Sequence, residues 1–167
     1  HLLTAPPDYE EEAGEIARLV EAEVPGARTL LELGCGGGNN ASHLKRHFEC
    51  TLTDLSPAML EVSRGLNPEC EHVEGDMRTF KLPERFPLII CPYRAFLHNL
   101  TEADQLACLR QVRGHLAPGG CFAFNVYYPT LEFMSHHTGS LAGVWRWRAT
   151  HPGADGATWE FTVRLQG

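Results

Sequence analysis

The sequence Leu30-Leu-Glu-Leu-Gly-Cys-Gly-Gly-Gly38 joins a short apolar segment to a cluster of glycines. The apolar part, residues 29–33, has the composition of a strand that is buried on both faces of a parallel sheet. Glycine tolerates positive φ angles and lets a ligand approach the backbone closely, so a glycine turn after such a strand is typical of nucleotide-binding sites. The junction therefore predicts an α/β fold with a ligand site at the end of this strand.

Helical and extended patterns alternate along the rest of the chain. Apolar residues at helical spacing predict helices over 8–24, 40–48, 58–66 and 101–116, and short apolar runs predict strands over 29–33, 50–53, 71–74, 86–91 and 121–126. Strands that alternate with helices indicate a Rossmann-like, doubly wound, mostly parallel sheet with helices on both faces.

The pattern changes after residue 128. Residues 144–150 and 158–165 have the composition of two strands, and the turn-rich segment 151–156 between them predicts an antiparallel β-hairpin. We expect one domain, with a ligand-binding core over 1–128 and an appendage over 129–167 that forms a lid or an insertion covering the substrate. The alternative is that the hairpin supplies the last two strands of the main sheet.

Composition and charge exclude several classes of protein. The 167 residues include 14 basic and 21 acidic side chains, and the net charge of -7 disfavours a nucleic-acid partner. Apolar runs are far shorter than the roughly 20 residues of a membrane-spanning helix. The first residues carry no basic start followed by an apolar stretch, so we expect a cytoplasmic protein. The sequence leaves open whether the protein forms a homodimer.

The cysteines and histidines do not predict a metal site. None of the six cysteines forms a CxxC pair, and we expect them to be reduced, mostly buried thiols. His43 and His47 lie four residues apart, which suits a metal, but the glutamate of the metalloprotease motif is missing between them. We therefore expect this pair to lie on a solvated helix face.

Two acidic residues follow the second and third predicted strands. Asp54 comes at the position where a carboxylate can accept hydrogen bonds from both hydroxyls of a ribose. Asp76, after Gly75, would lie at the carboxyl edge of the sheet, where open α/β sheets bind their ligands. Each residue alone is also explained as a helix cap or a turn. Together with the glycine turn, they predict one crevice that binds a nucleoside.

The spacing of the glycines distinguishes two kinds of cofactor. A dinucleotide fingerprint that starts at Gly34 requires a glycine at the position of Asn39. Gly34, Gly36 and Gly38 fit the pattern GxGxG instead. An NAD-dependent oxidoreductase is therefore the alternative hypothesis and not the favoured one.

The chain resembles the class I S-adenosylmethionine-dependent methyltransferases, in particular those with a Glu-Leu-Gly-x-Gly-x-Gly loop, Asp-x-Ser-x-x-Met-Leu and Gly-Asp-Met. These motifs occupy residues 32–38, 54–60 and 75–77, and residues 115–120 are similar to the family's Leu-x-Pro-Gly-Gly turn. The resemblance covers about residues 9–128. It implies S-adenosylmethionine as the cofactor and methyl transfer to a nitrogen or oxygen of a small molecule.

The resemblance also implies roles for single residues. The three glycines would admit the amino-acid part of the cofactor, Asp54 would hold the ribose, and Leu55 would pack on adenine. Asp76 and the Met77 amide would recognise the adenine edge, and Tyr9 would close over the cofactor. The expected cofactor contacts are Tyr9, Glu32, Gly34, Cys35, Gly36, Gly38, Asn39, Asp54, Leu55, Met59, Gly75, Asp76, Met77, Cys91 and Pro92.

The loop after the fourth strand, residues 91–98, would face the donor methyl group and the acceptor in such enzymes. Tyr93, Arg94 and His98 are the candidate catalytic residues, with Tyr93 or His98 as general base. A capping or packing role for His98 is an equal alternative. Pro92-Tyr93 matches only half of the Asn-Pro-Pro-Tyr motif, so we infer neither a nucleobase nor a glutamine substrate.

The sheet of this family normally ends with two strands beyond the fifth. Either the predicted hairpin supplies them or a carboxyl-terminal segment is missing from this chain, and we favour the second alternative. A sheet without these strands has an open edge. A third hypothesis is therefore a domain that binds the cofactor and catalyses nothing.

Overall fold

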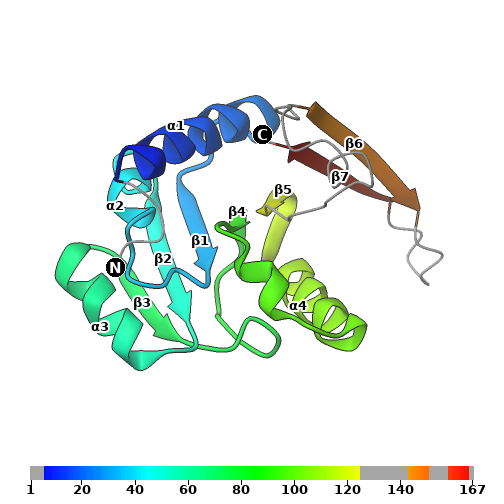
Figure 1. Ribbon diagram of the computed structural model, residues 1–167. Coiled ribbons are helices and arrows are strands. Elements are labelled where there is room, and N and C mark those ends of the chain that lie inside the picture. Colours follow the sequence, from blue (N-terminus) through cyan, green and yellow to red (C-terminus); the bar gives the residue numbers. More distant parts are fainter. Residues whose placement is uncertain (1–5, 125–142, 151–157, 166–167) are drawn as a thin grey trace, which may run out of the picture. The chain divides into compact units, whose positions relative to one another are not determined.

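The computed structural model describes residues 6–124, 143–150 and 158–165 (Figure 1). These residues fall into two compact units, which divide between Ala123 and Phe124. The first unit holds the helices and nearly all of a five-stranded sheet. Residues 125–142, which include the start of the predicted appendage, and the predicted turn over 151–156 lie outside the described residues.

Five strands form one sheet in the order β3-β2-β1-β4-β5. Their bounds are Thr29–Leu33 (β1), Glu49–Asp54 (β2), Glu71–Glu74 (β3), Phe86–Cys91 (β4) and Leu116–Phe124 (β5). β1 pairs in parallel with both β2 and β4, and β2 pairs in parallel with β3. The chain moves outward from β1 to β3 and then returns to β4 on the other side of β1. This reversal is the switch point at which doubly wound sheets bind their ligands, and the predicted fold class is confirmed.

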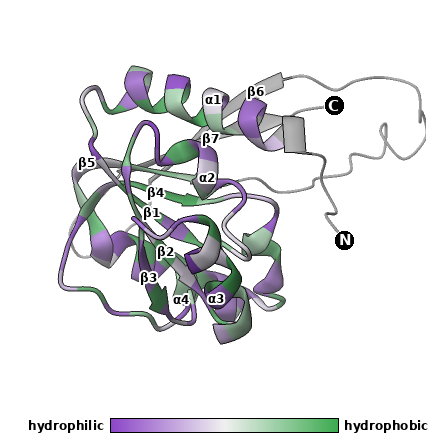
Figure 2. Ribbon diagram, turned by 90° about the vertical axis from the view of Figure 1, so that its left-hand side faces the viewer, coloured by the Kyte–Doolittle hydropathy of each residue, from purple (hydrophilic) through white to green (hydrophobic). Residues whose placement is uncertain are grey.

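The apolar segment before the glycines forms the middle strand of the sheet. Leu30, Leu31 and Leu33 of β1 are 0% exposed. Because successive side chains of a strand point to opposite faces, this burial shows that both faces of the sheet are covered. Figure 2 shows hydrophobic colouring along the central strands and mixed colouring along the helices.

Helices cover both faces. Their bounds are Pro6–Glu23 (α1), Ala41–Leu44 (α2), Pro57–Leu66 (α3) and Glu102–His115 (α4), with a short 3-10 helix, η1, at Ala95–His98. Val20, Leu44 and Leu60, from α1, α2 and α3, join apolar residues of β1, β2 and β4 in one hydrophobic cluster. The buried Cys108 and Val112 of α4 lie outside that cluster. Figure 1 shows α4 across the sheet from α1 and α2.

Two elements differ from the sequence-based expectation. The helix predicted over 40–48 is regular only at Ala41–Leu44, and hydrogen-bonded turns continue to Phe48. Residues 118–120, part of the turn that the resemblance implies over 115–120, lie inside β5, which begins directly after α4. Gly119 has φ +74° after Pro118, as at the third position of a type II turn, so the expected bend is present within the strand.

The second unit contains β6, Gly143–Thr150, and β7, Thr158–Leu165, which pair in antiparallel fashion from Gly143 with Leu165 to Thr150 with Thr158. Whether these strands cover a substrate stays a prediction. Within the described ranges, none of the helices combines the length and the apolar character needed to cross a membrane.

Candidate functional site

In the glycine turn after β1, two of the glycines have no room for a side chain and one has open space beside it. Gly34, Gly36 and Gly38 have φ angles of +72°, +54° and +76°. A Cβ on Gly34 would lie 2.8 Å from the Cβ of Ala95, and a Cβ on Gly38 would collide with Ser63. A Cβ on Gly36 would meet nothing within 4 Å. Gly36 is therefore the position at which a ligand can approach the backbone.

Hydrogen bonds connect the turn to β2 and to the residue that follows α3. The amides of Gly34 and Cys35 both donate to the carbonyl oxygen of Thr53, at 2.8 and 2.9 Å. Asn67, which follows α3 and is fully buried, donates its side-chain amide to the carbonyl oxygen of Gly38 at 2.9 Å. These bonds hold the glycine backbone in one conformation before any ligand arrives.

Asp54, the last residue of β2, connects two backbone segments. Its Oδ2 accepts from the Gly36 amide and its Oδ1 from the Ser56 amide, each at 2.8 Å. A carboxylate offers about four acceptor positions, so both oxygens retain capacity for further donors such as sugar hydroxyls. Beside it, Leu55 and Met59 are 66% and 48% exposed, which leaves apolar surface for a planar ring.

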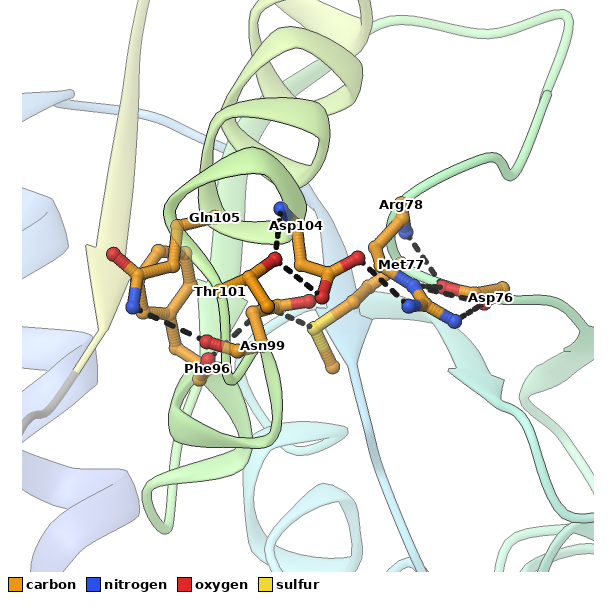
Figure 3. A network of polar contacts seen from close by, with 8 residues as sticks. All are labelled: Asp76, Met77, Arg78, Phe96, Asn99, Thr101, Asp104 and Gln105. Atoms are coloured by element: carbon orange, nitrogen blue, oxygen red, sulfur yellow. Dashed lines mark hydrogen bonds and ion pairs between the residues drawn. The ribbon is translucent and has the colours of Figure 1, made fainter.

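The segment after β3 carries Asp76 and Met77 (Figure 3). Arg78 donates to the Asp76 carboxylate from its backbone amide, at 2.8 Å, and from Nε and Nη2, at 2.9 and 2.6 Å. This arginine lowers the pKa of the Asp76 carboxyl, so Asp76 stays an anionic acceptor. The Met77 methyl group lies 3.6 Å from where a Gly34 Cβ would be, which brings the ends of β1 and β3 together.

The loop after β4 is strained. Tyr93 and Arg94 have φ angles of +51° and +63°, and such left-handed backbone costs on the order of 1–3 kcal/mol per non-glycine residue. The ring of Tyr9, from α1, lies 4.7 Å from the ring of Tyr93, centroid to centroid. Two tyrosines from distant parts of the chain thus meet at the carboxyl end of the sheet, next to Ala95 and the glycine turn.

The remaining predicted residues occupy different environments. Glu32 is buried within β1, and Cys91 and Pro92 are buried at the end of β4. Burial, with the charges of Glu32 and Asp54 as lesser causes, raises the pKa of the Cys35 thiol, so Cys35 stays neutral. Asn39 is half-buried and Gly75 follows β3 directly, whereas His98 is exposed at the end of η1.

Sequence reasoning missed the residues that support this site from a distance. Asn67 holds the glycine turn, and Arg78 and Asn99 hold the segment after β3. The position of Arg78, two residues after Asp76, could have indicated that it contacts this carboxylate. The described part of the chain contains no group of three His, Cys, Asp or Glu side chains arranged to hold a metal.

The fold and the site together define a Rossmann-like nucleotide-binding domain, whose candidate residues lie at the strand ends around the switch point between β1 and β4. The protein family described as methyltransferase domain matches residues 30–120. The chain therefore belongs to this family, and its resemblance to the class I S-adenosylmethionine-dependent methyltransferases is confirmed.

Two curated relatives in this family have named activities. The chain is 30% identical to a dTDP-3-amino-3,6-dideoxy-alpha-D-glucopyranose N,N-dimethyltransferase of Streptomyces fradiae, over 89% of this chain and 60% of the relative. It is also 30% identical to a dTDP-4-amino-2,3,4,6-tetradeoxy-D-glucose N,N-dimethyltransferase of Saccharopolyspora spinosa, over 94% of this chain and 65% of the relative. The chain thus spans about three fifths of the length of these relatives.

A solved structure has the same fold. The amino pentose methyltransferase CalS10 of Micromonospora echinaspora, solved with S-adenosylmethionine bound, superimposes with a TM-score of 0.69 at 26% identity. The match covers 95% of this chain and 76% of that one.

The different surroundings of the glycines predict different costs of substitution. Gly38→Ala adds the strain of a left-handed alanine, about 1–2 kcal/mol, to collisions with Ser63 and Asn67. Gly36→Ala adds the strain alone because the space is open. Urea unfolding should therefore show a larger loss of stability for Gly38→Ala than for Gly36→Ala. Equal losses in the two variants would contradict this packing.

Proposed function

We propose that this protein transfers a methyl group from S-adenosylmethionine to the amino nitrogen of a small molecule, with amino sugars as the acceptor class. The observation that carries the proposal is the 2.8 Å hydrogen bond from the open Gly36 to Asp54. It places ligand-accessible backbone beside a carboxylate with spare acceptor capacity, as binding of a nucleoside with an amino-acid tail requires.

The described residues fit this cofactor. The Gly36 backbone would contact its amino-acid part, and Asp54 would accept from the ribose hydroxyls. Leu55 and Met59 would cover the adenine ring, and Asp76 with the Met77 amide would recognise its edge. The cofactor supplies a methyl group on a positively charged sulfur, so the protein has mainly to align the acceptor and exclude water.

The acceptor side is assigned to the strained loop after β4. The ring of Tyr93 is held against Tyr9, so Tyr93 is better placed than the exposed His98 to orient an amine. His98 can still pass the released proton to solvent. Arg94 brings a positive charge next to Tyr93, which suits the diphosphate of a nucleotide-linked sugar.

The names of the relatives support an amino-sugar acceptor. Both curated relatives are N,N-dimethyltransferases of dTDP-linked amino sugars, and CalS10 is an amino pentose methyltransferase. No comparison favours an NAD-dependent oxidoreductase or a domain without activity. The assignment of residues 1–128 to a cofactor-binding core and of 129–167 to an appendage belongs to the same proposal.

Three further expectations accompany this function. The net charge of -7 argues against a nucleic-acid substrate. A cytoplasmic location is the expectation from the sequence, and a homodimer is a possibility that the sequence leaves open.

Methyl transfer to nucleotide-linked amino sugars tests the acceptor class. With S-adenosylmethionine present, mass spectrometry should detect one or two added methyl groups on the amino sugar and none on the matching hydroxy-sugar. The amine is the better nucleophile once it has lost its proton. If the protein binds S-adenosylhomocysteine but methylates no amino sugar, the proposed acceptor class is wrong.

Asp54→Asn tests the ribose contact. The variant loses the negative charge and turns an amide N–H₂ toward either the Gly36 or the Ser56 amide. Since hydrogen bonds to charged groups contribute about 1.5–3 kcal/mol, calorimetry should show S-adenosylhomocysteine binding weakened by about tenfold or more. Glu61→Gln, an exposed change on α3, is the control and should bind as the wild type does. Unchanged affinity in Asp54→Asn would remove the ribose role.

A further inference from the structure

Arg78 ties the segment after β3 to the first turn of α4. Its Nε and Nη2 bind the Asp76 carboxylate, and its Nη1 donates to Asp104 Oδ1 at 2.9 Å. Asp76 and Asp104 lie on opposite sides of the guanidinium group (Figure 3). One arginine therefore bridges two carboxylates that belong to different elements.

The α4 end of this bridge is itself fixed. Thr101 is the N-cap of α4, and its hydroxyl accepts from the Asp104 amide at 3.1 Å. The same hydroxyl donates to Asp104 Oδ2 at 2.8 Å. Because Oδ1 faces Arg78 and Oδ2 faces Thr101, the orientation of the Asp104 carboxylate is determined.

A second set of hydrogen bonds connects the segment after β3 to η1 and α4. The side-chain amide of Asn99, which is 3% exposed, donates to Met77 Sδ at 3.1 Å and to the carbonyl oxygen of Phe96 at 3.0 Å. Gln105 of α4 donates to the Asn99 carbonyl oxygen at 3.1 Å. Neighbouring residues after β3 are thus held from η1 and α4 at the same time.

We propose that Arg78 is a positioning residue for base recognition: it orients the Asp76 carboxylate toward the adenine amino group and so sets the preference for adenine over hypoxanthine. This inference rests on the proposed function, since it needs an adenine nucleoside at this crevice. Adenine presents an amino donor at the position where hypoxanthine presents a carbonyl oxygen. A fixed carboxylate therefore favours adenine and repels hypoxanthine.

The geometry of the arginine matters more than its charge. The Arg78 side chain is 41% exposed and Asp76 is 22% exposed, so water screens much of the attraction between them. What a guanidinium group adds is a planar fork that binds two acceptors in fixed directions. A lysine would keep the charge, but its single ammonium group cannot bind both oxygens of Asp76 and also reach Asp104 in these directions.

The test compares the binding of S-adenosylhomocysteine and S-inosylhomocysteine by calorimetry. Wild-type protein should prefer the adenine ligand by at least about tenfold, because the hypoxanthine carbonyl oxygen would face the Asp76 carboxylate with no donor between the two acceptors. Arg78→Gln should reduce this preference to about twofold or less, mainly through weaker binding of the adenine ligand. Arg78→Lys should behave like Arg78→Gln, and Asp104→Asn should fall between them and the wild type.

Arg64→Gln is the matched control. It removes another arginine that pairs with an acidic residue, Glu61, but on the surface of α3. This variant should keep the full preference for adenine.

Two results would overturn the inference. If Arg78→Gln keeps the full preference, Arg78 does not position Asp76. If both ligands bind more weakly by the same factor and the melting temperature falls in parallel, Arg78 only supports the fold. Should wild-type protein bind neither ligand, the proposed function itself is wrong, and this inference fails with it.

Discussion

The hydrogen bond between the Gly36 amide and the Asp54 carboxylate, 2.8 Å long, is the contact around which the site is arranged. It joins the turn after β1 to the end of β2, two parallel strands whose register sets Leu33 beside Thr53. It adds to the hydrogen bonds from the Gly34 and Cys35 amides to Thr53 and connects the open glycine directly to the carboxylate. The sheet therefore aligns the strand ends, and this bond connects the segments that leave them.

The rest of the crevice has conformations that isolated segments would avoid. Glycines supply the three positive φ angles of the turn after β1 without strain, but Tyr93 and Arg94 adopt left-handed backbone as non-glycine residues in the loop after β4. Such conformations persist only where the surrounding structure determines them. Here β1 and β4 are buried on both faces, and Tyr9 packs against Tyr93 from α1. A rigid sheet below and an aromatic contact beside the loop thus hold a strained surface at the place where a ligand would react.

Local sequence patterns predicted the strands, most helices and the placement of acidic residues at the strand ends, because each depends on residues that lie close together in the sequence. Asp54 and Asp76 are examples, since Asp54 ends β2 and Asp76 lies two residues after β3. Contacts between distant segments were not predictable in this way. Arg78 and Asp104 lie 26 residues apart and meet only because α4 returns to the end of β3. α2 is shorter than its apolar pattern suggested, and hydrogen-bonded turns occupy residues 45–48 before β2 begins.

An amide NMR titration with S-adenosylhomocysteine tests most directly whether one crevice holds the ligand. The account predicts that the largest chemical-shift changes occur together at Gly36, Leu55 and Met77, in the turns after β1, β2 and β3, and saturate with one dissociation constant. Shift changes confined to other surfaces, or saturation at different ligand concentrations for the three turns, would contradict it.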